Sequence, residues 1–304
     1  MTRTETIAHL KGIFAPVVTP FDRGGEVDYG LFRENVARTV DNGLGGILVA
    51  GSTGEAPYLA ERERLRLVDI ARRIVRRPEI LLVGTGLEST RETLRLSREA
   101  AARGADALLV ITPNYYKARM NSDALAEHYR TVAAGVARPV LVYSIPQFTG
   151  INPSPETLGR LSRLPNVVGL KESSGNLPFV RAILRNVRPG FRVLVGSVSI
   201  LLDALRAGAV GAVLSQATFV PELCVGLYEA FLRGQGRTAR EFQQRLLPLA
   251  QKIAIPYGVS GIKVALELCG YAGGFPRPPL LPLSAAQRRD VAQALREARA
   301  GLAF

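Results

Sequence analysis

A lysine follows a short apolar run in the stretch NVVGLKESSG, residues 166–175. The run itself is typical of a buried strand opened by a turn residue. Only five of the 39 basic residues are lysines, so the chain uses arginine wherever positive charge alone is needed. Arginine keeps its proton in proteins, whereas lysine can lose it, and a neutral amine can attack a ketone to form a Schiff base. Lys171 is therefore predicted to be a catalytic nucleophile.

The strand pattern also predicts where this side chain points. Alternate residues of a strand share a face, so Val167, Gly169 and Lys171 are expected to face the interior, with the glycine leaving room for the long side chain. Burial there disfavours the charged ammonium. The alternative is a structural lysine that pairs with a carboxylate, for which Glu172 and Glu55 are the candidates.

Polar residues at the ends of other apolar runs fit the same chemistry. Tyr143, in LVYSIP, offers a phenol that can carry a proton to and from a carbinolamine, with a hydroxyl bonded to the backbone as the alternative. The segment GSTGE, residues 51–55, supplies N–H groups and hydroxyls that can hold a small anion, unless it is an ordinary turn. It lacks the GK[ST] ending of a Walker loop, which favours a carboxylate over a polyphosphate. Together these groups indicate Schiff-base chemistry on a 2-oxo acid.

Composition argues against several other classes of protein. The cysteines and histidines, Cys224, Cys269, His9 and His128, lie far apart and lack metal-ligand spacing, so neither a metal site nor a disulfide framework is expected. The formal charge of +13 is scattered over helical stretches without interleaved aromatic residues, which argues against nucleic-acid binding. No apolar run reaches the roughly 18 residues of a membrane span, and the N-terminus lacks a signal-peptide core. We expect a cytoplasmic protein that binds neither nucleic acid nor membrane.

Eight short apolar runs, separated by helical segments, must position these residues. They are apolar nearly throughout, as strands of a parallel sheet covered on both faces should be. The runs span residues 12–20, 45–51, 79–86, 107–113, 139–146, 166–173, 191–197 and 208–216. Helices are predicted over residues 28–42, 60–77, 89–104, 122–136, 155–163, 177–187, 198–207 and 220–234. This alternation predicts an α/β fold, a (β/α)8 TIM barrel, with an open doubly wound sheet as the alternative.

The residues after 234 show no further strand pattern. Helices are predicted over 237–253 and 258–271, and SAAQ at 284–287 is expected to cap a last helix, as Ser89 with Glu92 caps an earlier one. The chain is therefore divided into a barrel domain, residues 1–234, and a C-terminal helical extension, residues 235–304. Barrel enzymes carry their active sites at the C-terminal ends of the strands, which is where the candidate residues stand.

The motifs GSTGE, TPNYY, VYSIPQFTG and GLKESSGN in combination resemble those of a family of pyruvate-dependent class I lyases. That family includes dihydrodipicolinate synthase, N-acetylneuraminate lyase and 4-hydroxy-2-oxoglutarate aldolase. The resemblance covers nearly the whole chain, from GIFAPVVTPF at residue 12 to SAAQ at residue 284. It implies a TIM barrel with a C-terminal helical extension, a small 2-oxo acid substrate, no cofactor, and a homotetramer built as a dimer of dimers.

The resemblance also implies roles for individual residues. Lys171 would form an imine with pyruvate or a pyruvoyl compound, Tyr143 and Ser52 would relay protons, and Tyr115 of TPNYY would reach across a dimer interface into the neighbouring site. Ser52 and Thr53 match the pair that binds the pyruvate carboxylate. The predicted substrate-binding residues are Ser52, Thr53, Gly54, Ser173 and Val213.

One position distinguishes between members of the family. Synthases that use aspartate semialdehyde resemble one another in carrying an arginine two residues after the proline of the VYSIP motif, and here Phe148 stands at that position. A phenyl ring cannot make a bidentate carboxylate contact. The stretches ESTRET (88–93), TPNYYKARMNS (112–122) and VYSIPQFTG (142–150) also resemble the 4-hydroxy-2-oxoglutarate aldolases most. We therefore expect 4-hydroxy-2-oxoglutarate aldolase, which yields pyruvate and glyoxylate, with dihydrodipicolinate synthase as the alternative. Arg119 is a candidate for replacing the missing arginine.

Two further classes remain open at this point. A pyridoxal-phosphate enzyme would also form an imine through a lysine, but it needs a phosphate site near strands seven and eight, where only GAVGAVLSQA offers one. A non-catalytic protein that binds a 2-oxo acid for sensing would retain the same cradle without turnover.

Overall fold

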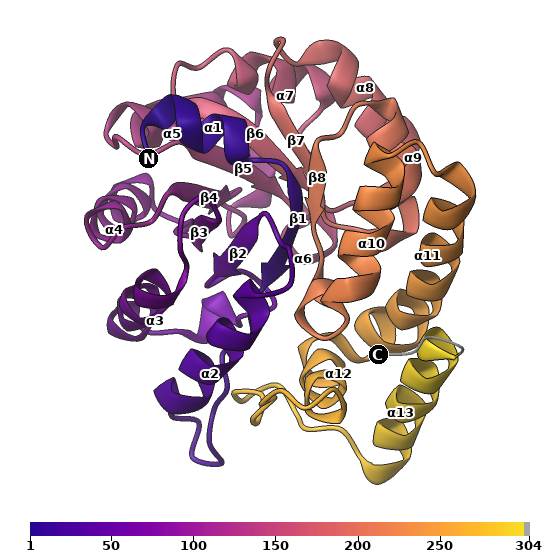
Figure 1. The fold of residues 1–304 in the computed structure, drawn as a ribbon. Coiled ribbons are helices and arrows are strands. Elements are labelled where there is room, and N and C mark those ends of the chain that lie inside the picture. The colour runs from indigo at the N-terminus through magenta and orange to yellow at the C-terminus, as the bar shows by residue number, and fades with distance from the viewer. Residues whose placement is uncertain (301–304) are drawn as a thin grey trace.

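The computed structural model describes residues 1–300, and within them eight parallel strands form a closed barrel (Figure 1). The strands pair in sequence order, and β8 pairs back with β1. Their bounds are β1 Gly12–Pro16, β2 Gly46–Val49, β3 Ile80–Gly84, β4 Ala107–Ile111, β5 Val140–Ser144, β6 Val167–Glu172, β7 Arg192–Val195 and β8 Gly211–Val213. The predicted TIM barrel is confirmed, and the open doubly wound sheet is excluded because the sheet has no edge.

Helices form in every segment where the sequence predicts one, with bounds that differ by a few residues. Those around the barrel are α2 Tyr29–Val40, α3 Glu61–Ile74, α4 Thr90–Ala102, α5 Ser122–Ala134, α7 Pro155–Ser162, α8 Leu177–Asn186, α9 Leu201–Ala207 and α10 Pro221–Leu232. At the start of α4 the hydroxyl of Ser89 accepts the N–H of Glu92 at 3.4 Å, but the Glu92 carboxylate pairs with Arg95. Only half of that capping box therefore forms.

Several short elements were not predicted from the sequence. Helix α1, Arg3–His9, lies at the end of the barrel where the strands begin (Figure 1), and Leu10 after it packs into the barrel interior. Helix α6, Pro146–Thr149, follows β5 directly. The remaining unpredicted turns are η1 Ala56–Tyr58, η2 Lys117–Arg119 and η4 Ser215–Thr218, whereas η3 Val198–Ile200 and most of the π-helix η5 Ala250–Ala254 fall within helices predicted over 198–207 and 237–253. Such single turns carry too few residues for a periodic pattern.

Strand β6 contains a β-bulge, so its side chains do not all lie on the faces that strict alternation predicts. Val140 pairs with Val167, but Leu141 pairs with Gly169, so Val168 is an extra residue on β6. Val167 consequently packs in the apolar layer outside the barrel, whereas Val168 belongs to the interior cluster. The prediction that Val167 shares a face with the lysine is wrong, because the bulge interrupts the alternation.

Gly169 also has a different role from the predicted one. A Cβ atom at this position would lie 2.6 Å from the carbonyl oxygen of Arg192. The glycine therefore allows strand β7 to approach closely, rather than making room for the lysine side chain.

The C-terminal extension consists of α11 Gly236–Leu249, η5, α12 Ile255–Leu268 and α13 Ala285–Arg299. Ser284 and Gln287 form the complete predicted capping box at α13. Leu246, Ile253 and Val291 of the extension share one apolar cluster with α9 and α10. Figure 1 places α12 at the end of the barrel opposite α1, where the strands terminate. None of the helices within residues 1–300 is long and apolar enough to cross a membrane.

Candidate active site

Lys171 and Tyr143 lie side by side at the C-terminal ends of two neighbouring strands. They are register partners on β6 and β5, and their side chains are only 5% and 4% exposed. The ammonium nitrogen of Lys171 lies 4.2 Å from the centroid of the Tyr143 ring, in the geometry of a cation–π contact. The barrel therefore brings an amine and a phenol together in a buried position, as the sequence predicts.

The structural alternative for Lys171 fails because both predicted carboxylate partners lie elsewhere. Glu172 is the next residue of the strand and faces the other side, where its carboxylate accepts the N–H of Ser174 at 2.7 Å. Burial raises the pKa of the Glu172 carboxyl. Glu55 contacts Lys263 at 2.6 Å. Among the described residues, no carboxylate lies within ion-pair distance of Lys171.

The GSTGE loop follows β2 and reaches the same cluster. The hydroxyl of Ser52 lies 3.2 Å from that of Tyr143, and either group can donate. Two bonds close the turn, from the N–H of Gly54 to the oxygen of Gly51 at 3.0 Å and from the N–H of Glu55 to the oxygen of Ser52 at 3.1 Å. The N–H groups of Ser52 and Thr53 have no acceptor within the described part of the chain. They are therefore free to bind an anion such as a carboxylate.

Two further predicted substrate residues stand at the ends of β6 and β8. Ser173 follows β6, and its buried hydroxyl has no partner among residues 1–300. A Cβ atom at Gly196 would lie 1.9 Å from that hydroxyl, so the glycine after β7 makes space for Ser173. Val213 ends β8 and belongs to the interior cluster that also contains Tyr143. The structure thus gathers these residues around the mouth of the barrel.

Tyr115 and Phe148 lie outside this buried cluster. Tyr115 is 76% exposed and makes an edge-to-face contact with Tyr116, with ring centroids 5.1 Å apart. The carboxylate of Glu88 accepts the N–H of Tyr115 at 2.8 Å and so holds this loop. Phe148 is 69% exposed on α6. Both aromatic rings are therefore presented at the surface near the strand ends.

Residues of the C-terminal extension that hold the GSTGE loop were not predicted from local patterns. Glu55 has a left-handed backbone, with φ of 56°, which costs about 1–2 kcal/mol for a residue with a Cβ atom. Its carboxylate contacts Lys263 of α12 and accepts the N–H of Arg277 at 2.8 Å. The rarity of lysine, which singled out Lys171, applies equally to Lys263 and could have found it.

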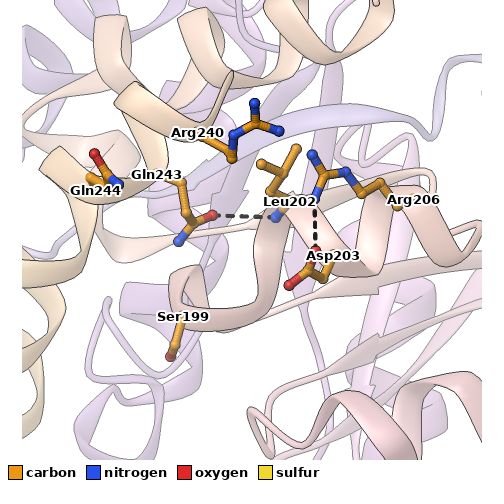
Figure 2. A pocket seen from close by; sticks show the side chains of 7 residues that line it. All are labelled: Ser199, Leu202, Asp203, Arg206, Arg240, Gln243 and Gln244. Carbon is orange, nitrogen blue, oxygen red and sulfur yellow. Dashed lines mark hydrogen bonds and ion pairs between the residues drawn. The ribbon is translucent and has the colours of Figure 1, made fainter. Parts of the chain in front are cut away.

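A surface cavity of about 220 Å³ lies away from these residues, between η3–α9 and α11 (Figure 2). It is lined by Ser199, Leu202, Asp203, Arg206, Arg240, Gln243 and Gln244. Gln243 accepts the N–H of Leu202 at 3.2 Å and donates to the oxygen of Val198 at 2.6 Å, so it joins the two elements. The contacts in this cavity are structural, and none of the strand-end residues lines it. No group of three or more metal-ligating side chains gathers within residues 1–300.

The chain is similar to known proteins over nearly its whole length. Residues 9–298 match the model of the dihydrodipicolinate synthetase family. The chain is 36% identical over 291 residues to the 4-hydroxy-tetrahydrodipicolinate synthase of Archaeoglobus fulgidus, covering 94% of this chain and 98% of that protein. It is 37% identical over 286 residues to the enzyme of that name from Synechococcus sp. strain CC9605, covering 93% of each.

Solved structures agree with the sequence comparison. Dihydrodipicolinate synthase from Thermotoga maritima superposes with a TM-score of 0.90 at 31% identity, covering 95% of this chain and 98% of that chain. A prophage protein of the dihydrodipicolinic acid synthase family from E. coli K12, in complex with pyruvate, gives 0.90 at 30% identity with the same coverage. These names favour the second of the two activities expected from the sequence over the aldolase that was expected first.

Proposed function

The chain belongs to the dihydrodipicolinate synthetase family of pyruvate-dependent class I lyases, and from this we propose that Lys171 forms an imine with pyruvate and that the acceptor is aspartate semialdehyde. The observation that carries the proposal is the buried contact between Lys171 and Tyr143, with Ser52 bonded to the phenol. The acceptor is proposed because full-length relatives carry the name 4-hydroxy-tetrahydrodipicolinate synthase.

The first half of the reaction follows from the arrangement of the strand ends. The neutral amine of Lys171 attacks the ketone carbon of pyruvate, and the carbinolamine loses water to give an imine. The N–H groups of Ser52 and Thr53 bind the pyruvate carboxylate, because they have no other acceptor within the described residues. Tyr143 supplies and removes the protons, with Ser52 as its partner at 3.2 Å.

The second half forms the carbon–carbon bond. The imine withdraws electrons, so a proton leaves the methyl carbon and an enamine results. The enamine carbon attacks the aldehyde carbon of the acceptor, and the developing alkoxide takes a proton from Tyr143. Ser173 is proposed to bind the acceptor, because its buried hydroxyl lacks a partner among residues 1–300. The amino group of the former aspartate semialdehyde then attacks the imine carbon, and the bond from that carbon to the nitrogen of Lys171 breaks, which releases the cyclic product and regenerates the amine.

Phe148 favours a second candidate, the cleavage of 4-hydroxy-2-oxoglutarate. An exposed phenyl ring at this place offers no charge for the carboxylate of aspartate semialdehyde. In the cleavage, the Lys171 imine draws electrons from the bond between C3 and C4 while Tyr143 takes the proton of the 4-hydroxyl. The bond breaks, glyoxylate departs, and protonation and hydrolysis of the enamine release pyruvate.

The two candidates are separated by assaying one preparation with both substrates. Condensation of pyruvate with aspartate semialdehyde by the unsubstituted protein would support the first candidate. Release of pyruvate from 4-hydroxy-2-oxoglutarate, with condensation appearing only in Phe148→Arg, would support the second. Leu232→Arg is the matched control, because it places the same charge on an exposed apolar position at the end of α10. An equal gain in condensation activity in both variants would show that Phe148 does not decide between the two acceptors.

The proposal extends to assembly and location. Tyr115 is proposed to enter the site of a neighbouring protomer, because its ring is exposed near the strand ends and matches the tyrosine that does so in the family. A homotetramer made of two tight dimers is part of this proposal. A cytoplasmic location, expected from the N-terminal sequence, is part of it as well.

A further inference from the structure

Lys263 is a second buried lysine, and it lies in the C-terminal extension. Its side chain, on α12, is almost fully buried. The ammonium contacts the Glu55 carboxylate at 2.6 Å and donates to the carbonyl oxygens of Thr19 at 2.8 Å and Phe275 at 2.6 Å. Burial lowers the pKa of Lys263, while the charge of Glu55 opposes that shift. The two carbonyl hydrogen bonds and the ion pair compensate the ammonium for the loss of water.

The other oxygen of Glu55 is held by a second segment of the extension. It accepts the N–H of Arg277 at 2.8 Å. The Arg277 guanidinium in turn makes two bonds to the Glu63 carboxylate, at 2.7 and 2.6 Å, and donates to the oxygen of Gly25 at 2.8 Å. Both cations lie over the Phe21 ring, with the Lys263 ammonium 4.6 Å and the Arg277 guanidinium 4.3 Å from its centroid. Both ends of the Glu55 carboxylate are therefore fixed by residues outside the barrel strands.

Glu55 is also the last residue of the GSTGE turn. Its left-handed backbone directs its N–H to the oxygen of Ser52, so the position of its side chain constrains the turn that presents Ser52 and Thr53. Lys263 acts on the same turn by a second route. It binds the carbonyl of Thr19, and the Thr19 hydroxyl donates to the oxygen of Gly54 at 2.8 Å.

We propose that Lys263 is a positioning residue that acts through Glu55 to hold the free N–H groups of Ser52 and Thr53 toward the carboxylate of pyruvate. The inference rests on the proposed pyruvate site at Lys171 but not on the identity of the acceptor aldehyde. The extension then serves the first half of the reaction, because α12 supplies the ammonium. A purely structural ion pair would change the free energy of unfolding and leave pyruvate binding unaltered.

The test compares Lys263→Met, Glu55→Gln and the double variant with the unsubstituted protein. Pyruvate is trapped on the protein by borohydride reduction, and the half-saturating pyruvate concentration is read from the mass gain. The single change Lys263→Met leaves a buried carboxylate without its cation and destabilises the fold, whereas the double variant buries no unpaired charge. Lys252→Met is the matched control. Lys252, like Lys263, pairs with a glutamate, but this ion pair with Glu297 lies within the extension and is exposed. Thermal unfolding is measured for every variant.

We expect the folded double variant to need about tenfold more pyruvate for half-saturation, the loss of one charge-assisted contact to the turn, while Lys252→Met stays within about twofold of the unsubstituted protein. A folded double variant with unchanged half-saturation would overturn the positioning role. If the unsubstituted protein traps pyruvate, unchanged half-saturation in the double variant contradicts the role of Lys263 but not the proposed function. No trapping by the unsubstituted protein would overturn the proposed function, and this inference with it.

Discussion

Replacing Tyr143 by phenylalanine removes the proposed proton carrier and little else. Within residues 1–300 the hydroxyl has one hydrogen-bond partner, the Ser52 hydroxyl at 3.2 Å. The ring remains, so its burial and its place 4.2 Å from the Lys171 ammonium are retained. The lost hydrogen bond contributes about 1 kcal/mol to stability, so Tyr143→Phe should fold normally. Because positioned acid–base groups contribute about 10²–10⁴ in rate, kcat should fall by about that factor.

The assay combines steady-state kinetics, borohydride trapping at equilibrium and thermal unfolding. Trapped pyruvate should reach the same extent in Tyr143→Phe, because the amine and the carboxylate cradle are intact. Tyr129→Phe is the matched control: its hydroxyl is also buried, in the layer between α5 and the barrel, and donates to the oxygen of Val110 at 2.9 Å. This change should lower the unfolding free energy by about 1–3 kcal/mol and leave kcat unchanged. A kcat for Tyr143→Phe within a few-fold of the original would refute the assigned role.

Two further predictions concern an exposed pair and a buried histidine. Tyr115→Phe should lower kcat by about 10² if its hydroxyl serves a neighbouring site, whereas Tyr116→Phe, beside it and equally exposed, should not; equal effects would argue against that role. Burial lowers the pKa of His128 to about 4, so the unfolded chain takes up a proton more readily below the ordinary value of 6.5. The free energy of unfolding should therefore fall by roughly 3 kcal/mol from this group as pH drops from 6.5 toward 4. Urea unfolding at several pH values measures this fall, which should be smaller in His128→Gln.

The sequence predicts the barrel and Lys171 because both depend on local patterns. Alternating apolar runs and amphipathic helices repeat within a few tens of residues, and each strand end follows directly from its run. Lys171 stands out because lysine is rare and the preceding run is apolar. The phenol of Tyr143 and the turn at Ser52 were found by the same rule, and the closed sheet brings them together.

The features that were not predicted from the sequence depend on contacts between distant parts of the chain. The pairing of Glu55 with Lys263 joins the second βα turn to the C-terminal extension, and no local pattern indicates it. The bulge at Val168 arises from the register between β5 and β6, so alternation along β6 alone misplaces Val167. The preference between two acceptors rested on Phe148 and on the likeness of three short stretches, whereas the comparisons weigh nearly the whole chain.

Peptide mapping after borohydride reduction in the presence of pyruvate tests the central claim most directly. The unsubstituted protein, Lys171→Ala and the double variant Lys263→Met/Glu55→Gln are treated alike, so that both buried lysines are compared. The account predicts one modified peptide, the one that contains Lys171, in the unsubstituted protein and in the double variant at saturating pyruvate, and none in Lys171→Ala. Modification at another lysine, or an unmodified protein at saturating pyruvate, would contradict it.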